Sequence, residues 1–134
     1  NIGPTAAMGV GIANTAWLSS GGWYDVGNQT YTYYFNGSII GGAYSNGVYT
    51  EYSKPLTTSD VAGVAFDLTA STVSFYKNNV LVVTVSIPSG QTWFATSGNG
   101  SSISQSYGAY FNFGQQPFTY TPPTGFLALN TFNI

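Results

Sequence analysis

The sequence predicts an all-β protein that folds as an antiparallel β-sandwich of about eight strands, with a barrel as the lesser alternative. Short runs rich in Val, Ile, Thr, Tyr and Phe alternate with clusters of Gly, Asn and Ser, which is typical of short strands joined by turns. Gly or Pro interrupts every stretch of helix length, so no helix is expected. A chain of 134 residues accommodates one hydrophobic core and is too short for two ordinary domains.

The expected strands follow one another with short connections. Their ranges are 6–13, 30–35, 47–52, 61–68, 72–77, 80–86, 92–96 and 107–113, and residues 17–29 form a loop. The best-supported hairpin joins 72–77 to 80–86, because the intervening Asn78 and Asn79 tolerate the positive φ that a type I′ turn requires. Alternation along the later strands places Trp93, Phe111 and Phe113 in the core.

The chain becomes proline-rich from residue 115 onward, and prolines exclude a central strand there. We therefore divide the chain into a sandwich over residues 1–121 and a tail over 122–134 that packs on the domain or leaves it. Phe118, Tyr120 and Phe126 are expected to fasten this region to the body along one edge.

Charge is scarce, at 4% of residues against a typical value of about 25%. With two lysines and no arginine, the chain cannot form the basic patch that nucleic acids or anionic membranes require. No apolar run of about 18 residues is present, so membrane insertion is not expected. A neutral polar surface of this kind favours an extracellular or virion location.

Histidine and cysteine are absent, which excludes Ser-His-Asp and Cys-His catalysis and thiolate metal sites. A pair of carboxylates for glycoside hydrolysis is the remaining enzymatic alternative, with Asp25, Glu51, Asp60 and Asp67 as its candidates. Each of these acids has a structural interpretation. Asp60 and Asp67 lie at strand ends, Glu51 is a solvated charge on a strand, and Asp25 lies in the Trp/Gly loop. No calcium-loop motif is present. We therefore assign no catalytic residue, no metal and no cofactor.

Aromatic residues are the better candidates for a binding site. Trp17, Trp23 and Tyr24 lie in a Gly/Ser-rich loop, and Tyr44 and Tyr49 flank the loop of residues 45–47. Flat aromatic faces beside amide and hydroxyl groups suit neutral sugars, and Tyr and Trp are also preferred anchors in protein contacts. The alternative is that Trp17 and Trp23 fold back over one end of the sandwich as a plug.

Three segments carry a resemblance to a known family. They are DVAGVAFDLTASTVSFYKNN (60–79), YFNFGQQPFTYTPPTGFLALNT (110–131) and the shorter VGIAN (10–14). Together they resemble the SPRY (B30.2-like) domain, a concanavalin-type two-sheet sandwich, in the form found in bacteriophage tail and capsid-fibre proteins. The resemblance implies an interaction or glycan-contact scaffold without catalytic activity.

The family's first strand, roughly W-Y-W-E-V, has no counterpart ahead of Asn1. We therefore expect a fragment, a processed form, or a subunit whose missing strand comes from another chain. The resemblance then implies an open sheet edge near residues 1–13, where a partner strand would add.

These observations favour a non-enzymatic virion structural module, in a phage fibre, tail or capsid decoration, located in the virion or outside the cell. Its partners would be neighbouring virion subunits, in an oligomer, or a host-surface glycan, with no nucleic acid and no membrane. One alternative is a self-assembling filament or decoration subunit without a ligand. A polysaccharide-degrading enzyme is the third.

Binding by this chain should be insensitive to ionic strength, because there is almost no charge for salt to screen. Affinity for the partner, measured by titration across a range of salt concentrations, is expected to stay constant. A weakening of roughly tenfold would contradict binding through aromatic and neutral polar groups.

Overall fold

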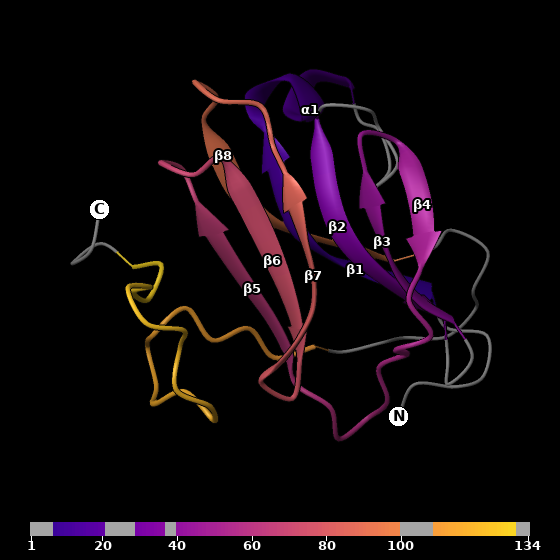
Figure 1. Cartoon of the computed structure of the whole chain (residues 1–134), viewed down its shortest axis with the longest axis vertical. Helices are drawn as coiled ribbons and strands as arrows, with labels where there is room; N and C mark the ends of the chain where they lie inside the picture. The colour runs from indigo at the N-terminus through magenta and orange to yellow at the C-terminus, as the bar shows by residue number, and fades with distance from the viewer. Residues whose placement is uncertain (1–6, 21–28, 37–39, 100–108, 131–134) are drawn as a thin grey trace.

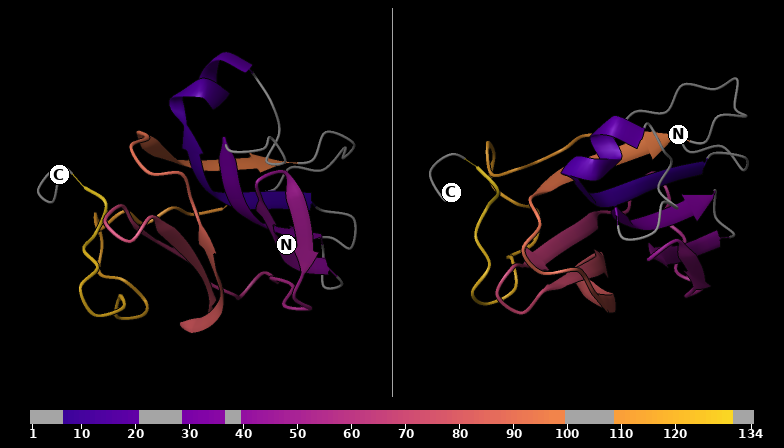
Figure 2. Two further views of the ribbon diagram at one scale, coloured as in Figure 1. Left: turned by 45° about the horizontal axis from the view of Figure 1, so that its top comes forward. Right: turned by 90° about the horizontal axis from the view of Figure 1, so that it is seen from above.

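The computed structural model describes residues 7–20, 29–36, 40–99 and 109–130, and in this part of the chain eight strands form two antiparallel sheets (Figure 1). The larger sheet has the order β4-β3-β2-β1-β8, and the smaller sheet has the order β5-β6-β7. The bounds are β1 Ala7–Asn14, β2 Thr30–Asn36, β3 Ile40–Ser45, β4 Val48–Glu51, β5 Ala62–Asp67, β6 Thr72–Lys77, β7 Val80–Ser86 and β8 Trp93–Asn99. The two sheets form separate layers (Figure 2), so the expected all-β sandwich is confirmed.

The core lies between the inner faces of the two sheets. Alternate residues of the central strands are buried there, with Tyr33 on β2 and Phe75 on β6 meeting across the layers at 5.9 Å between ring centroids. The other buried apolar side chains are Met8, Val10, Ile12, Ala13, Tyr31, Phe35, Ala43, Leu56, Val73 and Ile87. Trp93 packs against this core, as expected, and its ring meets that of Tyr31 edge-on at 5.6 Å. Period-two alternation therefore positions the core.

The predicted hairpin between β6 and β7 is confirmed. Asn78 and Asn79 both have positive φ, at 49° and 66°, as a two-residue type I′ turn requires. The strands pair antiparallel from Lys77 opposite Val80, with a β-bulge between Phe75 and Tyr76.

The strand β3 was missed because its sequence, IGGAYS, begins with two glycines after isoleucine. Glycine weakens a strand by propensity, but it is also used where another backbone approaches closely. A Cβ added to Gly41 would lie 2.3 Å from the carbonyl of Lys54, and one added to Gly42 would lie 2.2 Å from that of Thr50. Tertiary contact therefore requires glycine at these strand positions.

A short helix, α1, spans Thr15–Ser20. The expectation of no helix was therefore wrong, and the helix includes the first residues of the loop expected over 17–29. Its start has a local cause. The Oδ1 atom of Asn14 accepts hydrogen bonds from the backbone N–H groups of Ala16, at 3.1 Å, and Trp17, at 3.3 Å. This is the arrangement of an N-cap, which satisfies donors that the first helical turn leaves free.

The expected strand at 107–113 was also wrong over its described residues, because 109–113 form no strand. Phe111 and Phe113 are 42% and 38% exposed, so they are not core residues. Their rings stack on each other instead, with centroids 6.1 Å apart. The Oδ1 atom of Asn112 accepts the backbone N–H of Gly114 at 2.9 Å, and this local turn competes with extension of a strand.

The open edge expected near residues 1–13 is contradicted for the described residues 7–13, because β1 lies inside the larger sheet. It pairs with β2 on one side, where Val10 is opposite Tyr33, and with β8 on the other, where Val10 is opposite Ser97. The outer strands of that sheet are β4 and β8. Any strand addition must therefore occur elsewhere.

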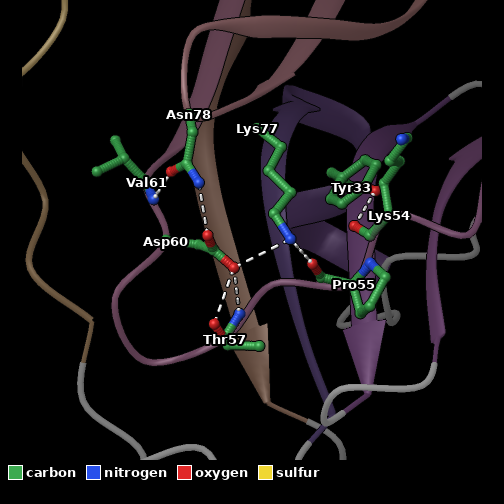
Figure 3. Close-up of polar contacts among 8 residues, drawn as sticks. All are labelled: Tyr33, Lys54, Pro55, Thr57, Asp60, Val61, Lys77 and Asn78. Carbon is green, nitrogen blue, oxygen red and sulfur yellow. Dashed lines mark hydrogen bonds and ion pairs between the residues drawn. The ribbon is translucent and has the colours of Figure 1, made fainter.

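The chain crosses from the larger sheet to the smaller one through residues 54–61. Asp60 connects this segment with the end of β6 (Figure 3). Its Oδ2 atom lies 3.1 Å from the Lys77 ammonium and accepts the backbone N–H and hydroxyl of Thr57 at 2.8 and 2.9 Å. Its Oδ1 atom accepts a 2.6 Å bond from the Asn78 amide, and Lys77 also donates to the carbonyl of Pro55 at 2.5 Å. The carboxylate is thus held by donors from both sides of the junction.

The same junction continues at both ends (Figure 3). Asn78 and Val61 exchange two bonds, of 2.8 Å from the Val61 N–H to the Asn78 amide oxygen and 2.9 Å from the Asn78 N–H to the Val61 carbonyl. At the other end, the Tyr33 hydroxyl donates to the Lys54 carbonyl at 2.5 Å. We call residues 54–61 with Tyr33, Lys77 and Asn78 the crossing junction.

The C-terminal region 109–130 contains no helix or strand and lies beside β5 (Figure 1). Phe118 and Tyr120 each expose more than a third of their surface, and Phe126 is half-buried. Gly114 has φ of 99°, and a Cβ there would lie 2.5 Å from that of Ala128, so glycine allows this region to fold back on itself. Among the helices of the described residues, none has the length and apolar character to cross a membrane.

The crossing junction predicts a loss of stability in acid. Partial burial would raise the pKa of Asp60, but the hydrogen bonds from Thr57, Asn78 and Lys77 outweigh it and lower the pKa to about 2. A depressed carboxyl pKa contributes stability above the pKa of the unfolded chain, near 4, and this contribution disappears as the pH falls toward 2. The free energy of unfolding should therefore fall by about 2 kcal/mol over this range through Asp60 alone.

Denaturant titrations followed by tryptophan fluorescence between pH 2 and 6 would measure this effect. Asp60→Asn should be less stable at neutral pH, by about 1–3 kcal/mol, and should show a flatter acid dependence than the unaltered chain. An unchanged slope in Asp60→Asn would contradict the role given to the junction.

Candidate binding surface

Three tyrosines converge on the outer face of the larger sheet, the face turned away from the core. Tyr34 lies on β2, Tyr44 on β3 and Tyr49 on β4. The register places Tyr34 opposite Gly42 and Tyr44 opposite Tyr49, so these side chains share one face. Because side chains alternate along a strand, the neighbouring Tyr33 points to the core instead.

The rings of these residues touch one another, and we call them the tyrosine cluster. The Tyr44 and Tyr49 ring centroids lie 5.1 Å apart, while Tyr34 meets both rings edge-on, at 5.8 Å from Tyr44 and 5.9 Å from Tyr49. Edge-to-face pairs are a favoured aromatic geometry. All three side chains are half-buried, so each keeps part of its ring at the surface.

Two glycines make this arrangement compatible with the backbone. A Cβ at Gly42 would lie 2.7 Å from the ring of Tyr49, so the ring lies across a position where only hydrogen fits. Asn46 and Gly47 form the turn between β3 and β4, with φ of 52° and 75°, the positive values of a type I′ hairpin. This two-residue turn brings Tyr44 directly opposite Tyr49.

Glu51 borders the cluster at the end of β4 and organises it through hydrogen bonds. Its Oε2 atom accepts the Tyr49 hydroxyl at 2.5 Å, and its Oε1 atom accepts the backbone N–H groups of Ser53, at 2.6 Å, and Gly41, at 3.1 Å. The Tyr49 hydrogen bond and these backbone donors lower the pKa of Glu51 against a smaller opposing effect of burial. The carboxylate is therefore ionised at neutral pH.

The same contacts hold the tyrosines protonated. Burial, followed by the hydrogen bond and negative charge of Glu51, raises the pKa of Tyr49 far above its ordinary value. Burial and the charge of Glu51 also raise the pKa of Tyr33, beneath the cluster, to about 12. Because the Tyr49 proton is directed at Glu51, the surface offers ring faces, hydroxyl oxygens and one carboxylate to a ligand.

The structure thus brings together Tyr44 and Tyr49 of the aromatic residues predicted from sequence. Trp17 lies in α1 and is half-buried. Trp23 and Tyr24 lie outside the described residues. Sequence reasoning missed Tyr34, although its position between inward-facing Tyr33 and Phe35 indicates the outer face once the strand is recognised.

The candidate acids have structural contacts. Asp67 accepts the backbone N–H groups of Thr69 and Ala70 at 2.8 and 2.9 Å, closing the turn after β5. Asp60 belongs to the crossing junction and Glu51 to the tyrosine cluster, while Asp25 lies outside the described residues. Across the ranges that the structure describes, no three acidic side chains gather in a way that could hold a metal ion.

A shallow depression lies between β8 and the C-terminal region. It is lined by Ala95, Thr96 and Ser97 of β8 and by the stacked Phe111 and Phe113. Its lining is mainly apolar and contains no charged group. It offers few polar groups to orient a ligand, so the tyrosine cluster is the better candidate.

No family model matches the chain. In a comparison with curated proteins, the chain is similar to the ATP-dependent RNA helicase DDX1 of Xenopus laevis, with 28% identity over 124 residues. The match covers 90% of this chain but 16% of the helicase, so the chain corresponds to a small part of that protein.

The bond between Tyr49 and Glu51 can be tested by titration. Tyr49→Phe keeps the ring and removes the hydroxyl donor, so the pKa of Glu51 should rise toward its ordinary value. Carboxyl-carbon NMR of Glu51 across acidic pH would measure the change. Tyr76→Phe, which alters a hydroxyl on the other sheet, should leave the Glu51 titration unaltered; equal titrations in all three proteins would contradict the assignment.

Proposed function

We propose that this chain is a non-enzymatic contact module of SPRY type, a virion structural part that binds a neutral host-surface glycan through the tyrosine cluster. The observation that carries the proposal is the convergence of Tyr34, Tyr44 and Tyr49 on one outer sheet face beside Glu51. The virion setting rests on the phage-like closing motif and on the nearly uncharged composition.

The chemistry of the cluster suits a sugar ring. Partly exposed tyrosine faces contact the C–H surface of a pyranose, and their hydroxyl groups exchange hydrogen bonds with its hydroxyls. The Glu51 carboxylate adds a strong acceptor for sugar hydroxyl donors. Because Glu51 and Gly42 hold the Tyr49 ring in place, little side-chain freedom is lost on binding.

The SPRY assignment has two supports. The motifs at 60–79 and 110–131 resemble that family, and the helicase similar to this chain over 124 residues contains a SPRY domain. The two-sheet antiparallel fold agrees with such a domain.

The helicase's own activity is not carried over to this chain. Nucleotide-binding loops of the P-loop type place a lysine directly after a glycine, whereas Lys54 follows serine and Lys77 follows tyrosine. Two lysines without arginine also leave no basic surface for RNA. The described acids hold turns, the crossing junction and the cluster, which supports a role without catalysis.

A glycan array probed with the intact chain tests the proposal. Binding of a neutral glycan is expected, and Tyr44→Ala should weaken it by roughly tenfold or more, because the substitution removes a central ring of the cluster. Tyr110→Ala is the matched control, since it removes a fully exposed tyrosine of the C-terminal region. Thermal unfolding of both variants would confirm that each remains folded.

Equal binding by Tyr44→Ala and Tyr110→Ala would overturn the role of the cluster. A chain that forms stable oligomers or fibres while binding no glycan would instead support the alternative, a decoration or filament subunit without a ligand. Release of sugar from a host polysaccharide would overturn the non-enzymatic assignment.

A further inference from the structure

Among the described residues the two layers of the sandwich are unequal in width, and no described strand occupies the position beside β7. In the smaller sheet, β5 contacts β1 and β7 contacts β3. Since β4 is the next strand beyond β3, a strand added to the free side of β7 would lie over β4. Figure 1 shows β3 and β4 to the right of β7, with no strand of the smaller sheet drawn in front of them.

The inner side of β4 is exposed at this position. Val48 pairs with Ser45 and Thr50 pairs with Ala43, so Val48 and Thr50 share the inner face with Ala43. Ala43 is 2% exposed, whereas Val48 is 65% exposed and Thr50 is also exposed. The core face of the larger sheet therefore continues beyond the smaller sheet that covers it.

The free edge of β7 offers backbone groups for pairing. The Ile87 N–H donates to the Ser71 carbonyl at 2.9 Å, so the backbone groups of Ile87 are directed toward the β6 side of the strand. The direction of the backbone N–H and C=O groups alternates along an antiparallel strand. Those of Val85 are therefore directed toward β6, and those of Thr84 and Ser86 are directed outward. The 2.7 Å bond between the Ser74 and Thr84 hydroxyls agrees, because side chains lie closest in pairs whose backbones do not bond.

The composition of this edge restricts what can bind. Charged residues and proline commonly block pairing at the edge of a sheet. The sequence of β7, VLVVTVS, contains neither. A charge placed between β7 and the inner side of β4 would be buried without a partner. The added segment must therefore be uncharged where it pairs, with alternate apolar side chains over Val48.

Steric constraints exclude a second copy that pairs at this edge through a strand covered by its own second layer. Strands pair at about 4.8 Å and sheets pack about 10 Å apart, so the layer beneath the added position is already filled by β4. The second layer of such a copy would overlap β4. A single extended segment has no such layer and fits.

We propose that the free edge of β7 is a β-augmentation site that accepts one extended, uncharged segment of a partner protein. The segment pairs with the outward backbone groups of Thr84 and Ser86 and covers Val48 with its apolar side chains. This site lies on the inner side of the sandwich, away from the tyrosine cluster, and does not depend on the glycan proposal.

The probe is a blocked synthetic peptide of alternating threonine and valine, and the control peptide has the same composition with its valines grouped. Amide hydrogen exchange of the intact chain, followed by NMR, is the measurement. The alternating peptide should slow exchange at Thr84 and Ser86, while Val85, already directed at β6, should change little. The control peptide should have no such effect.

Two variants separate edge pairing from general adhesion. Thr84→Pro removes an outward N–H at an edge position and should weaken peptide binding at least about tenfold, whereas Thr84→Val loses the same hydroxyl bond and should bind normally. Val48→Lys, at an exposed position, places a charge under the added strand and should weaken binding in a folded chain.

Three results would overturn the proposal. The first is slow exchange at Thr84 and Ser86 in the chain without peptide, which would show that the edge is already paired. The second is equal binding of the alternating and grouped peptides. The third is unchanged binding by Val48→Lys. None of these depends on whether a glycan binds the tyrosine cluster.

Discussion

The carboxylate of Asp60 and the ammonium of Lys77 meet where the chain passes from one sheet to the other, and the rest of the sandwich depends on that junction. A sandwich needs its two layers held in one relative position, and a chain with so few charges has few strong polar contacts for this purpose. Asp60 receives donors from Thr57, Lys77 and Asn78, which lie on both sides of the junction. Tyr33 extends the contact into the larger sheet through the Lys54 carbonyl.

The junction also determines which surfaces remain available. With the smaller sheet set over β1 to β3, no described strand of that sheet covers the inner face of β4. This inner face carries exposed Val48 next to the outer edge of β7, whereas the tyrosine cluster lies on the opposite face of the larger sheet. The offset between the layers therefore underlies the proposed strand-addition site, and the alternation of side chains along β2, β3 and β4 underlies the proposed glycan contact.

Sequence patterns predicted the features that depend on near neighbours. Period-two alternation located most strands, and the Asn78-Asn79 dipeptide specified the type I′ hairpin, because positive φ is a property of single residues. The failures share a cause. Gly41 and Gly42 lower strand propensity yet lie in β3, since Lys54, Thr50 and Tyr49 approach too closely for a side chain there. Such contacts join residues whose proximity no local pattern reveals.

The features of the candidate surface also fall into those that the sequence predicts and those that only the structure shows. The sequence by itself determined that the chain is all-β, that histidine and cysteine chemistry is absent, and that Tyr44 and Tyr49 flank a turn. Only the tertiary structure decided that Tyr34 joins them, that β1 is central and not an open edge, and that no described strand pairs with the side of β7 that lies over β4. Composition and turn chemistry are local properties, whereas strand order and layer overlap arise from long-range pairing that depends on how the whole core packs.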